Sequence, residues 1–193
     1  MRLFAAVKIP DETRESLARF CEDLRKYFPL PQKVKWVETP NLHLTLKFFG
    51  EIEPGRLDGL GRALSLAAGK HRRFSARAKG AGTFPEGRPA RVLWAGIEDP
   101  AGALSRLAES VESDTVAAGF SPSDKPFSPH LTLARFPIVP PSAFQTKLAG
   151  HPDPGFGEIK VDKVFLIESR LGPSGPVYLD LKEFHLAPRL YAD

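Results

Sequence analysis

The sequence is poor in residues that crosslink a chain or hold a metal cluster. It has one cysteine, Cys21, among its 193 residues, so no disulfide can form within the chain and no cysteine-based zinc site is possible. Cys21 also falls on the apolar side of a helical pattern, which favours a place in the core over a role as a nucleophile.

Long apolar runs are missing too. No stretch approaches the roughly 18 apolar residues that a membrane-spanning helix requires. The N-terminal segment has neither the long apolar region nor the small-residue cleavage site of a secretory signal. We therefore expect a cytoplasmic protein with no membrane partner.

Several catalytic signatures are absent from the sequence. It contains no HExxH motif, no G-x-S-x-G around a nucleophilic serine and no GxxxxGK[ST] phosphate loop. A metal site built from His43, His130 and either His151 or His185 has no acidic residue at ligand spacing in its favour. We predict that the protein uses no metal and no cofactor.

The residues that are present suit a globular protein. Hydrophobic residues make up 42% of the chain and charged residues 26%, which is ordinary for a folded domain. The formal net charge of +4 is compatible with a phosphate-bearing partner but does not require one. The length suffices for one sizeable core or for two small lobes that share one.

Apolar periodicity predicts a mixture of helices and strands. Helices are expected over about 11–28, with Asp11 as N-cap and Pro29 and Pro31 ending it, and over 56–68, 104–115 and 142–148. Strands are expected at 2–9, 33–37, 42–49, 73–84, within 87–97, and at 130–136, 158–168 and 177–186. Because runs of strands adjoin without helices between them, the pattern favours an α+β fold with mostly antiparallel sheets.

One tetrapeptide, His-Leu-Thr-Leu, occurs at 43–46 and again at 130–133. In each half of the chain a helix and a loop precede it. We therefore predict a duplicated, bilobal fold: two mostly antiparallel sheets with outer helices and a central cleft, forming a single domain over residues 1–193.

Strand geometry divides the side chains of each copy between two faces. Successive side chains point to opposite sides of a strand, so the sequence predicts an apolar face of Leu42, Leu44, Leu46 and Phe48 and a polar face of Asn41, His43, Thr45 and Lys47. In the second copy, Leu131 and Leu133 oppose His130 and Thr132. A lone histidine on a half-buried strand is usually structural, but two identical motifs favour one site built from both lobes.

Two imidazoles and two hydroxyls suit the opening of a phosphodiester. Imidazoles that titrate near neutrality can serve as general base and general acid. Hydroxyls can donate hydrogen bonds to the non-bridging oxygens of a phosphate. In-line attack requires the acid and the base on opposite sides of phosphorus, which two opposed lobes would provide.

At these residues the sequence resembles the two-histidine (2H) phosphoesterase superfamily, whose signature is a pair of His-x-Thr/Ser-x motifs. It is most similar to the bacterial and archaeal RNA 2′,3′-cyclic phosphodiesterases, historically called 2′-5′ RNA ligases. The similarity extends over nearly the whole chain, through the blocks RLFAAVKIP, NLHLTLKFFG, RVLWAGI and FSPHLTLARF.

The resemblance implies hydrolysis of a 2′,3′-cyclic phosphate to a 2′-phosphate without ATP or metal. It implies His43 as the acid, His130 as the base, and Thr45 and Thr132 as phosphate ligands. It also implies that Arg135 lies near the substrate, although strict alternation places Arg135 on the face opposite His130.

Other residues are weaker candidates. Phe127 either stacks on a base or packs under its loop, and Lys47 and Lys125 are candidates for steering an anionic substrate. Trp36 and Trp94 have apolar neighbours, so we expect both in the core.

Three functions remain open at the level of sequence. The first is hydrolysis of RNA 2′,3′-cyclic phosphate ends or of a small cyclic nucleotide. The second is 2′-5′ RNA ligation by the reverse reaction, and the third is a non-catalytic module that binds RNA ends. We expect a monomer in each case.

Overall fold

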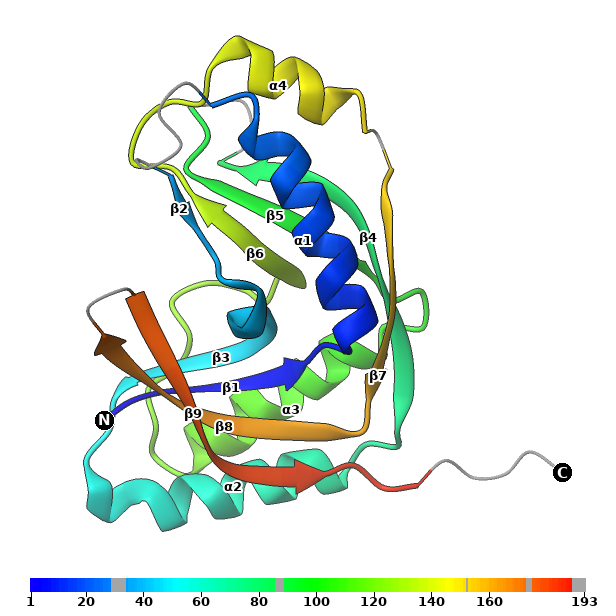
Figure 1. Ribbon diagram of the computed structural model, residues 1–193. Coiled ribbons are helices and arrows are strands. Elements are labelled where there is room, and N and C mark those ends of the chain that lie inside the picture. Colours follow the sequence, from blue (N-terminus) through cyan, green and yellow to red (C-terminus); the bar gives the residue numbers. More distant parts are fainter. Residues whose placement is uncertain (29–33, 86–88, 152, 173–174, 189–193) are drawn as a thin grey trace, which may run out of the picture.

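The computed structural model describes residues 1–28, 34–85, 89–151, 153–172 and 175–188 (Figure 1). Its helices are α1 (Asp11–Arg25), α2 (Leu57–Gly69), α3 (Ala103–Ala117) and α4 (Ser142–Ala149). Its strands are β1 (Arg2–Lys8), β2 (Lys35–Trp36), β3 (His43–Glu51), β4 (Phe74–Phe84), β5 (Val92–Glu98), β6 (His130–Arg135), β7 (Gly155–Val161), β8 (Lys163–Gly172) and β9 (Gly175–His185). No helix in these ranges is long and apolar enough to cross a membrane.

The strands form one sheet in the order β7-β4-β5-β6-β3-β1-β8-β9, with β2 paired to β6. Neighbouring strands are antiparallel throughout. Between β3 and β6 the register consists of one residue pair, Leu44 with Leu131. The sheet therefore divides into two halves that meet at the two His-Leu-Thr-Leu strands, which confirms the predicted α+β duplicated fold. The two predicted sheets are the halves of this one continuous sheet.

The helices cover each half separately (Figure 1). Helix α1 contacts β7 and α4, whereas α2 contacts α3, β8 and β9. Leucines at helical spacing are completely buried beneath them, among them Leu17 and Leu24 of α1 and Leu60 and Leu64 of α2. Burial of these apolar faces drives the helices onto the sheet.

Two boundary predictions were wrong. Asp11 is the first residue of α1 and Pro10 is its N-cap, since the carbonyl of Pro10 accepts the first helical hydrogen bond, from Arg14 N–H at 2.9 Å. The strand predicted at 158–168 is two strands that break at Asp162, because β7 pairs with β4 in one half whereas β8 pairs with β1 in the other. Pro29 and Pro31, the predicted end of the first helix, lie outside the described residues.

Strand β1 shows how the two sides of the sheet differ. Leu3, Ala5 and Val7 belong to the main core under the helices, whereas Phe4 and Ala6 join Ile167 in a separate small cluster. We call the side that carries this second cluster the open face. His43 and Thr45 lie on it as well, because their cross-strand partners are Lys8 and Ala6.

Candidate active site

The centre of the site is the pair Leu44 and Leu131, both completely buried on the core side. The residues on either side of each leucine therefore point to the open face. Continuing the antiparallel register by one residue brings His43 next to Thr132 and Thr45 next to His130. All four side chains are half-buried. The structure thus gathers them where the two halves of the sheet meet, and we call them the His-Thr quartet.

Both histidines are oriented by the same local hydrogen bond. His43 Nδ1 lies 2.7 Å from the carbonyl oxygen of Asn41, and His130 Nδ1 lies 2.7 Å from that of Ser128. A carbonyl only accepts, so each Nδ1 must carry a hydrogen and donate it. The neutral tautomer then has its lone pair on Nε2. Each ring consequently presents Nε2 as the atom that can take or give a proton.

The surroundings of His43 are aromatic on two sides. Its ring centroid is 4.8 Å from that of Phe4 and 5.2 Å from that of Tyr178, which meets it edge-on. Burial among these rings lowers the pKa of His43, and the hydrogen bond to Asn41 only partly opposes the shift. The Asn41 side chain donates to the carbonyl of Pro176 at 3.0 Å, which ties the segment before His43 to β9.

His130 has a different neighbour, Phe84, whose ring meets the imidazole edge-on at 5.4 Å. Phe84 in turn lies 5.2 Å from Trp94 at an interplanar angle of 32°. Trp94 was predicted in the core, and this prediction was wrong. Its cross-strand partner is Thr132, so it lies on the open face, whereas Trp36 does pack against the core.

A β-bulge changes the faces predicted for the end of β3. Ala6 pairs with Thr45 but Ala5 pairs with Lys47, so Leu46 is an extra residue. Lys47 is therefore buried, 2.9 Å from Glu112, and Phe48 is 59% exposed on the open face beside Phe4. The prediction that Lys47 shares a face with His43 was wrong, and Lys47 is not available to steer a substrate.

The second copy has the same bulge at the same place. Trp94 pairs with Thr132 but Leu93 pairs with Ala134, which makes Leu133 the extra residue. The bulge brings Arg135 back to the open face, where strict alternation did not allow it, and Lys35 lies directly opposite. The charge of Arg135 acts on Tyr178, whose pKa is raised by burial and partly lowered by Arg135 and Arg2.

Two other predicted candidates, Phe127 and Lys125, are not part of the quartet. Phe127 packs against the main core, the second of the two alternatives that the sequence left open. Lys125 is exposed in the segment between α3 and β6.

The other histidines are engaged elsewhere: His71 with Ser110 at 2.8 Å, His151 with Asp23 at 3.7 Å and His185 with Glu183 at 3.1 Å. Within the described ranges, no three His, Cys, Asp or Glu side chains are grouped so that they could hold a metal ion.

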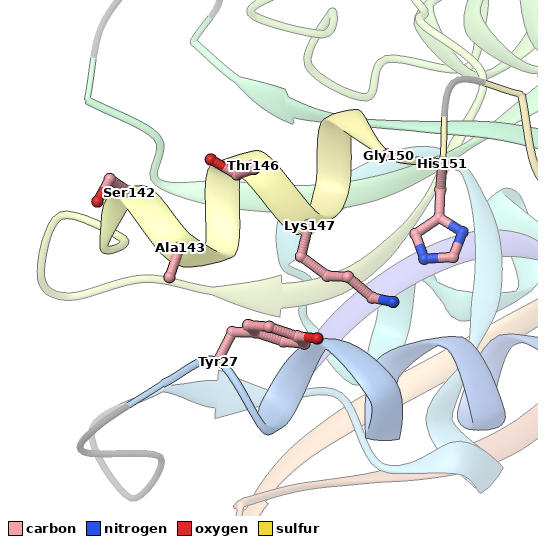
Figure 2. Close-up of a pocket in the computed structure, with 7 residues that line it drawn as sticks. All are labelled: Tyr27, Ser142, Ala143, Thr146, Lys147, Gly150 and His151. Carbon is pink, nitrogen blue, oxygen red and sulfur yellow. The ribbon is translucent and has the colours of Figure 1, made fainter.

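A pocket of about 560 Å³ lies at some distance from the quartet, between the end of α1 and helix α4 (Figure 2). Its lining residues are Tyr27, Ser142, Ala143, Thr146, Lys147, Gly150 and His151. Lys147, its one lysine, is 2.8 Å from Asp23 and contacts the Tyr27 ring. The charge that would attract an anionic ligand is thus already paired within the protein.

Sequence reasoning missed the aromatic residues that flank the histidines. Phe4, Tyr178 and Phe84 come from strands distant in sequence, so no local pattern connects them with the motifs. Phe48 did carry a signal, because it precedes Phe49. Two adjacent aromatics cannot both face the core of a regular strand, and one of them had to point outward.

Comparison with known proteins gives a consistent result. Residues 7–94 and 96–178 match the family described as LigT-like phosphoesterase. An RNA 2′,3′-cyclic phosphodiesterase of Methanothermobacter thermautotrophicus is 33% identical, with 96% of this chain and 99% of that protein covered. One from Archaeoglobus fulgidus is 35% identical, with 95% and 99% covered.

Solved structures agree. The protein TT0787 of Thermus thermophilus superposes with a TM-score of 0.80 at 34% identity, covering 98% of this chain and all of that one. Escherichia coli LigT, crystallised with 3′-AMP, gives a TM-score of 0.73 at 32% identity, with 96% and 97% covered. Matches in both halves and over nearly the full length place this chain in the LigT-like phosphoesterase family.

Proposed function

We propose that the protein hydrolyses 2′,3′-cyclic phosphodiester ends of RNA to 2′-phosphomonoesters, with His43 and His130 as acid and base. The observation that carries the proposal is the matched pair of Nδ1 hydrogen bonds, which leaves both Nε2 atoms on one face of the sheet. Among the described residues neither Nε2 has a hydrogen-bond partner, as a group that must exchange protons requires. Relatives named RNA 2′,3′-cyclic phosphodiesterase support the substrate class.

The proposed reaction is a single in-line displacement. His130 Nε2 takes a proton from water as the water oxygen bonds to phosphorus. The bond from phosphorus to O3′ breaks, and His43 Nε2 donates its proton to that oxygen. The phosphate stays on O2′, and the two histidines end with their protonation states exchanged.

The remaining open-face residues have roles that follow from their chemistry. Thr45 and Thr132 alternate with the histidines, so their hydroxyls can donate to the two non-bridging oxygens. Arg135 and Lys35 add positive charge at one border of the quartet, which favours the charge that builds on those oxygens in the transition state. Phe48, exposed beside Thr45, offers its ring to the terminal base.

A short RNA ending in a 2′,3′-cyclic phosphate tests the proposal. Wild-type protein, with EDTA and without ATP, is expected to convert it to a 2′-phosphate. His43→Ala and His130→Ala should each lose roughly 10²- to 10⁴-fold in rate, the usual contribution of a general acid or base. Full activity in either variant would contradict its assigned role.

The same assay separates the alternatives. A module that only binds RNA ends would bind wild type and both variants alike and convert none of the substrate. Ligation would appear as a 2′-5′-linked product when a second RNA with a free 5′-OH is added. Water is by far the more concentrated acceptor, so hydrolysis should dominate in dilute RNA.

We also propose that residues 1–193 act as a single bilobal domain and as a cytoplasmic monomer. The quartet takes one His and one Thr from each half of the sheet, so neither half has a complete site. Both halves belong to one chain, so no second copy is needed to complete the site. Sedimentation of the active protein at micromolar concentration would test the monomer.

A further inference from the structure

The segment between α3 and β6 carries the chain from one half of the molecule to the other. Helix α3 contacts β3 and α2, so it belongs to the half that contains His43. Strand β6, which begins at His130, pairs with β5 in the other half. The segment between them, residues 118–129, includes Ser128, whose carbonyl holds His130 Nδ1. The position of this segment therefore bears on the orientation of the proposed base.

A pair of hydrogen bonds anchors this segment to α3. Ser123 donates from its backbone N–H and from its hydroxyl to the two carboxylate oxygens of Glu112, at 2.9 and 2.7 Å. Within 121–127, no other residue hydrogen-bonds to the described part of the chain, although Phe127 packs against the main core. Apolar packing has no preferred direction, so Phe127 fixes the depth of the segment, whereas the paired bonds of Ser123 fix its orientation.

Lys47 of β3 holds Glu112 from the core side. The bulge in β3 turns Lys47 inward, where its ammonium is 1% exposed and lies 2.9 Å from the Glu112 carboxylate. Loss of Glu112 would leave this buried charge unpaired, so Lys47 keeps the carboxylate in place. Burial raises the pKa of Glu112, but the donors of Lys47 and Ser123 outweigh that effect and keep the pKa below its usual value. The carboxylate is therefore ionised at neutral pH.

The first copy of the motif anchors its histidine more directly. There Asn41 supplies the carbonyl to the imidazole, and its own side chain donates to the carbonyl of Pro176 in β9. The side chain of Ser128, which is exposed, has no such hydrogen bond to a described residue. The second copy thus lacks the direct tie, and its nearest hydrogen-bonded anchor earlier in the chain is Ser123.

We propose that Glu112 is a positioning residue for His130: held by Lys47 on the strand of one histidine, it fixes the segment whose end orients the other. The inference rests on the proposed function, in which His130 Nε2 takes a proton from water. Without the anchor, the Ser128 carbonyl would hold the Nδ1 proton less firmly, and the neutral ring would spend part of its time with its proton on Nε2. That tautomer cannot accept a proton at Nε2, so kcat falls although the phosphate ligands are unchanged.

Nitrogen NMR of the imidazoles tests the proposal directly. Two-bond ¹H–¹⁵N correlation spectra, recorded at a pH where both rings are neutral, give the tautomer of each histidine. We expect His130 to carry its proton on Nδ1 in wild type and to show a mixture of tautomers in Glu112→Gln and Ser123→Ala. His43 should keep its Nδ1 proton in every variant and serves as an internal standard, because its carbonyl partner is anchored on β9.

The rate on a 2′,3′-cyclic nucleotide should follow the tautomer. Glu112→Gln is expected to lower kcat roughly 10- to 10²-fold with little change in KM, the effect of a small misplacement near a catalytic group. Ser123→Ala should lose less, because the Ser123 N–H remains. Ser123→Thr keeps the hydroxyl and should match wild type.

Asp114→Asn and Ser121→Ala are the matched controls. Asp114 lies on the same helix as Glu112 and accepts from Lys70 at 2.7 Å, a pair that joins α3 to the residue after α2 and leaves the segment untouched. Ser121 is exposed in the segment and makes no hydrogen bond to a described residue. Both variants should keep the kcat and the His130 tautomer of wild type.

A role in stability alone would give a different result. It would lower the melting temperature of Glu112→Gln and Asp114→Asn and leave kcat and the His130 tautomer of the folded variants unchanged, which would overturn the proposal. Where Glu112→Gln does not fold, Ser123→Ala decides alone, and an unchanged tautomer there overturns the proposal. If wild type left the cyclic phosphate intact, the proposed function would fail, whereas the spectra would still show whether Glu112 positions His130.

Discussion

The two halves of the site use one strand design in different surroundings. In both, a histidine donates from Nδ1 to the carbonyl two residues earlier, a leucine anchors the strand, and a bulge follows the threonine. Around His43 the rings of Phe4 and Tyr178 enclose the imidazole and lower its pKa. Around His130, Phe84 is the one ring among the described residues that contacts the imidazole, and it does so edge-on.

The features that the two halves share differ in kind from the features in which they diverge. The repeated parts are those that hold the groups proposed for proton transfer and for binding the phosphate. The parts that differ are an exposed Phe48 in one half and an exposed Arg135 in the other, and we propose that they contact the substrate beyond the phosphate. In the proposed mechanism, duplication supplies the acid and the base, and divergence of the flanking residues distinguishes their roles.

The largest expected effect distinguishes acid from base. On the cyclic phosphate, His43→Ala and His130→Ala should both be slower by roughly 10²- to 10⁴-fold. On an activated 4-nitrophenyl phosphodiester the leaving group needs no proton, so His43→Ala should recover to within about tenfold of wild type. His130→Ala should not recover, and the opposite pattern would exchange the two roles.

The threonines should matter equally if the quartet is symmetric about the phosphate. Thr45→Val and Thr132→Val keep the shape of the side chain and remove its hydroxyl. Each is expected to lower kcat by about 10²-fold, as for loss of one preorganised donor to a phosphoryl oxygen. Thr→Ser variants retain the donor and serve as controls. A large effect at one position only would show that the phosphate is held by one half.

The two strands differ in a buried charge, because Ala134 occupies the position of Lys47 in the second copy. Substitution of Lys47 tests whether this charge contributes to stability. Lys47→Met removes a buried cation from Glu112, whose side chain is one-third exposed. We expect a loss of about 1–3 kcal/mol in the free energy of unfolding, reduced from the fully buried case by that exposure. Urea denaturation measures it.

Lys8→Met is the matched control for this loss. Lys8 pairs with Asp180, and both side chains are more than 40% exposed, so the change should cost about 1 kcal/mol or less. Equal losses for the two variants would mean that burial of Lys47 contributes nothing.

The smallest effect concerns the pH dependence. The profile of kcat/KM should be bell-shaped, because one histidine must be neutral and the other protonated. If His43 is the acid, activity falls as pH rises through its pKa, and burial keeps that pKa below its usual value. Tyr178→Ala exposes His43 and raises the pKa, so the alkaline limb should move to higher pH. Movement of the acidic limb instead would identify His43 as the base.

Much of this site was predictable because it depends on local rules. Alternation placed His43, Thr45, His130 and Thr132 away from the leucines, and the structure agrees. Alternation failed just beyond the two threonines, at Lys47 and Arg135. A β-bulge lies there in each strand, and a bulge depends on pairing with β1 and β5 rather than on the sequence of the strand itself. The aromatic neighbours of the histidines could not be predicted for the same reason, since Tyr178 lies beside His43 only because of the strand order of the whole sheet.

The bulges also mark positions at which each strand could lose one residue. Because Leu46 and Leu133 are extra residues opposite continuous stretches of β1 and β5, a one-codon deletion at either place would keep the pairing with those two strands. Loss of Leu133 would also remove the carbonyl that accepts a hydrogen bond from Val37 N–H at 2.9 Å. Phe48 and Arg135 would still face outward, since two consecutive inward residues would become one. What the deletion would remove is local twist, and with it curvature where the two halves diverge. In-frame loss of one leucine therefore separates the shape of the sheet from its chemistry.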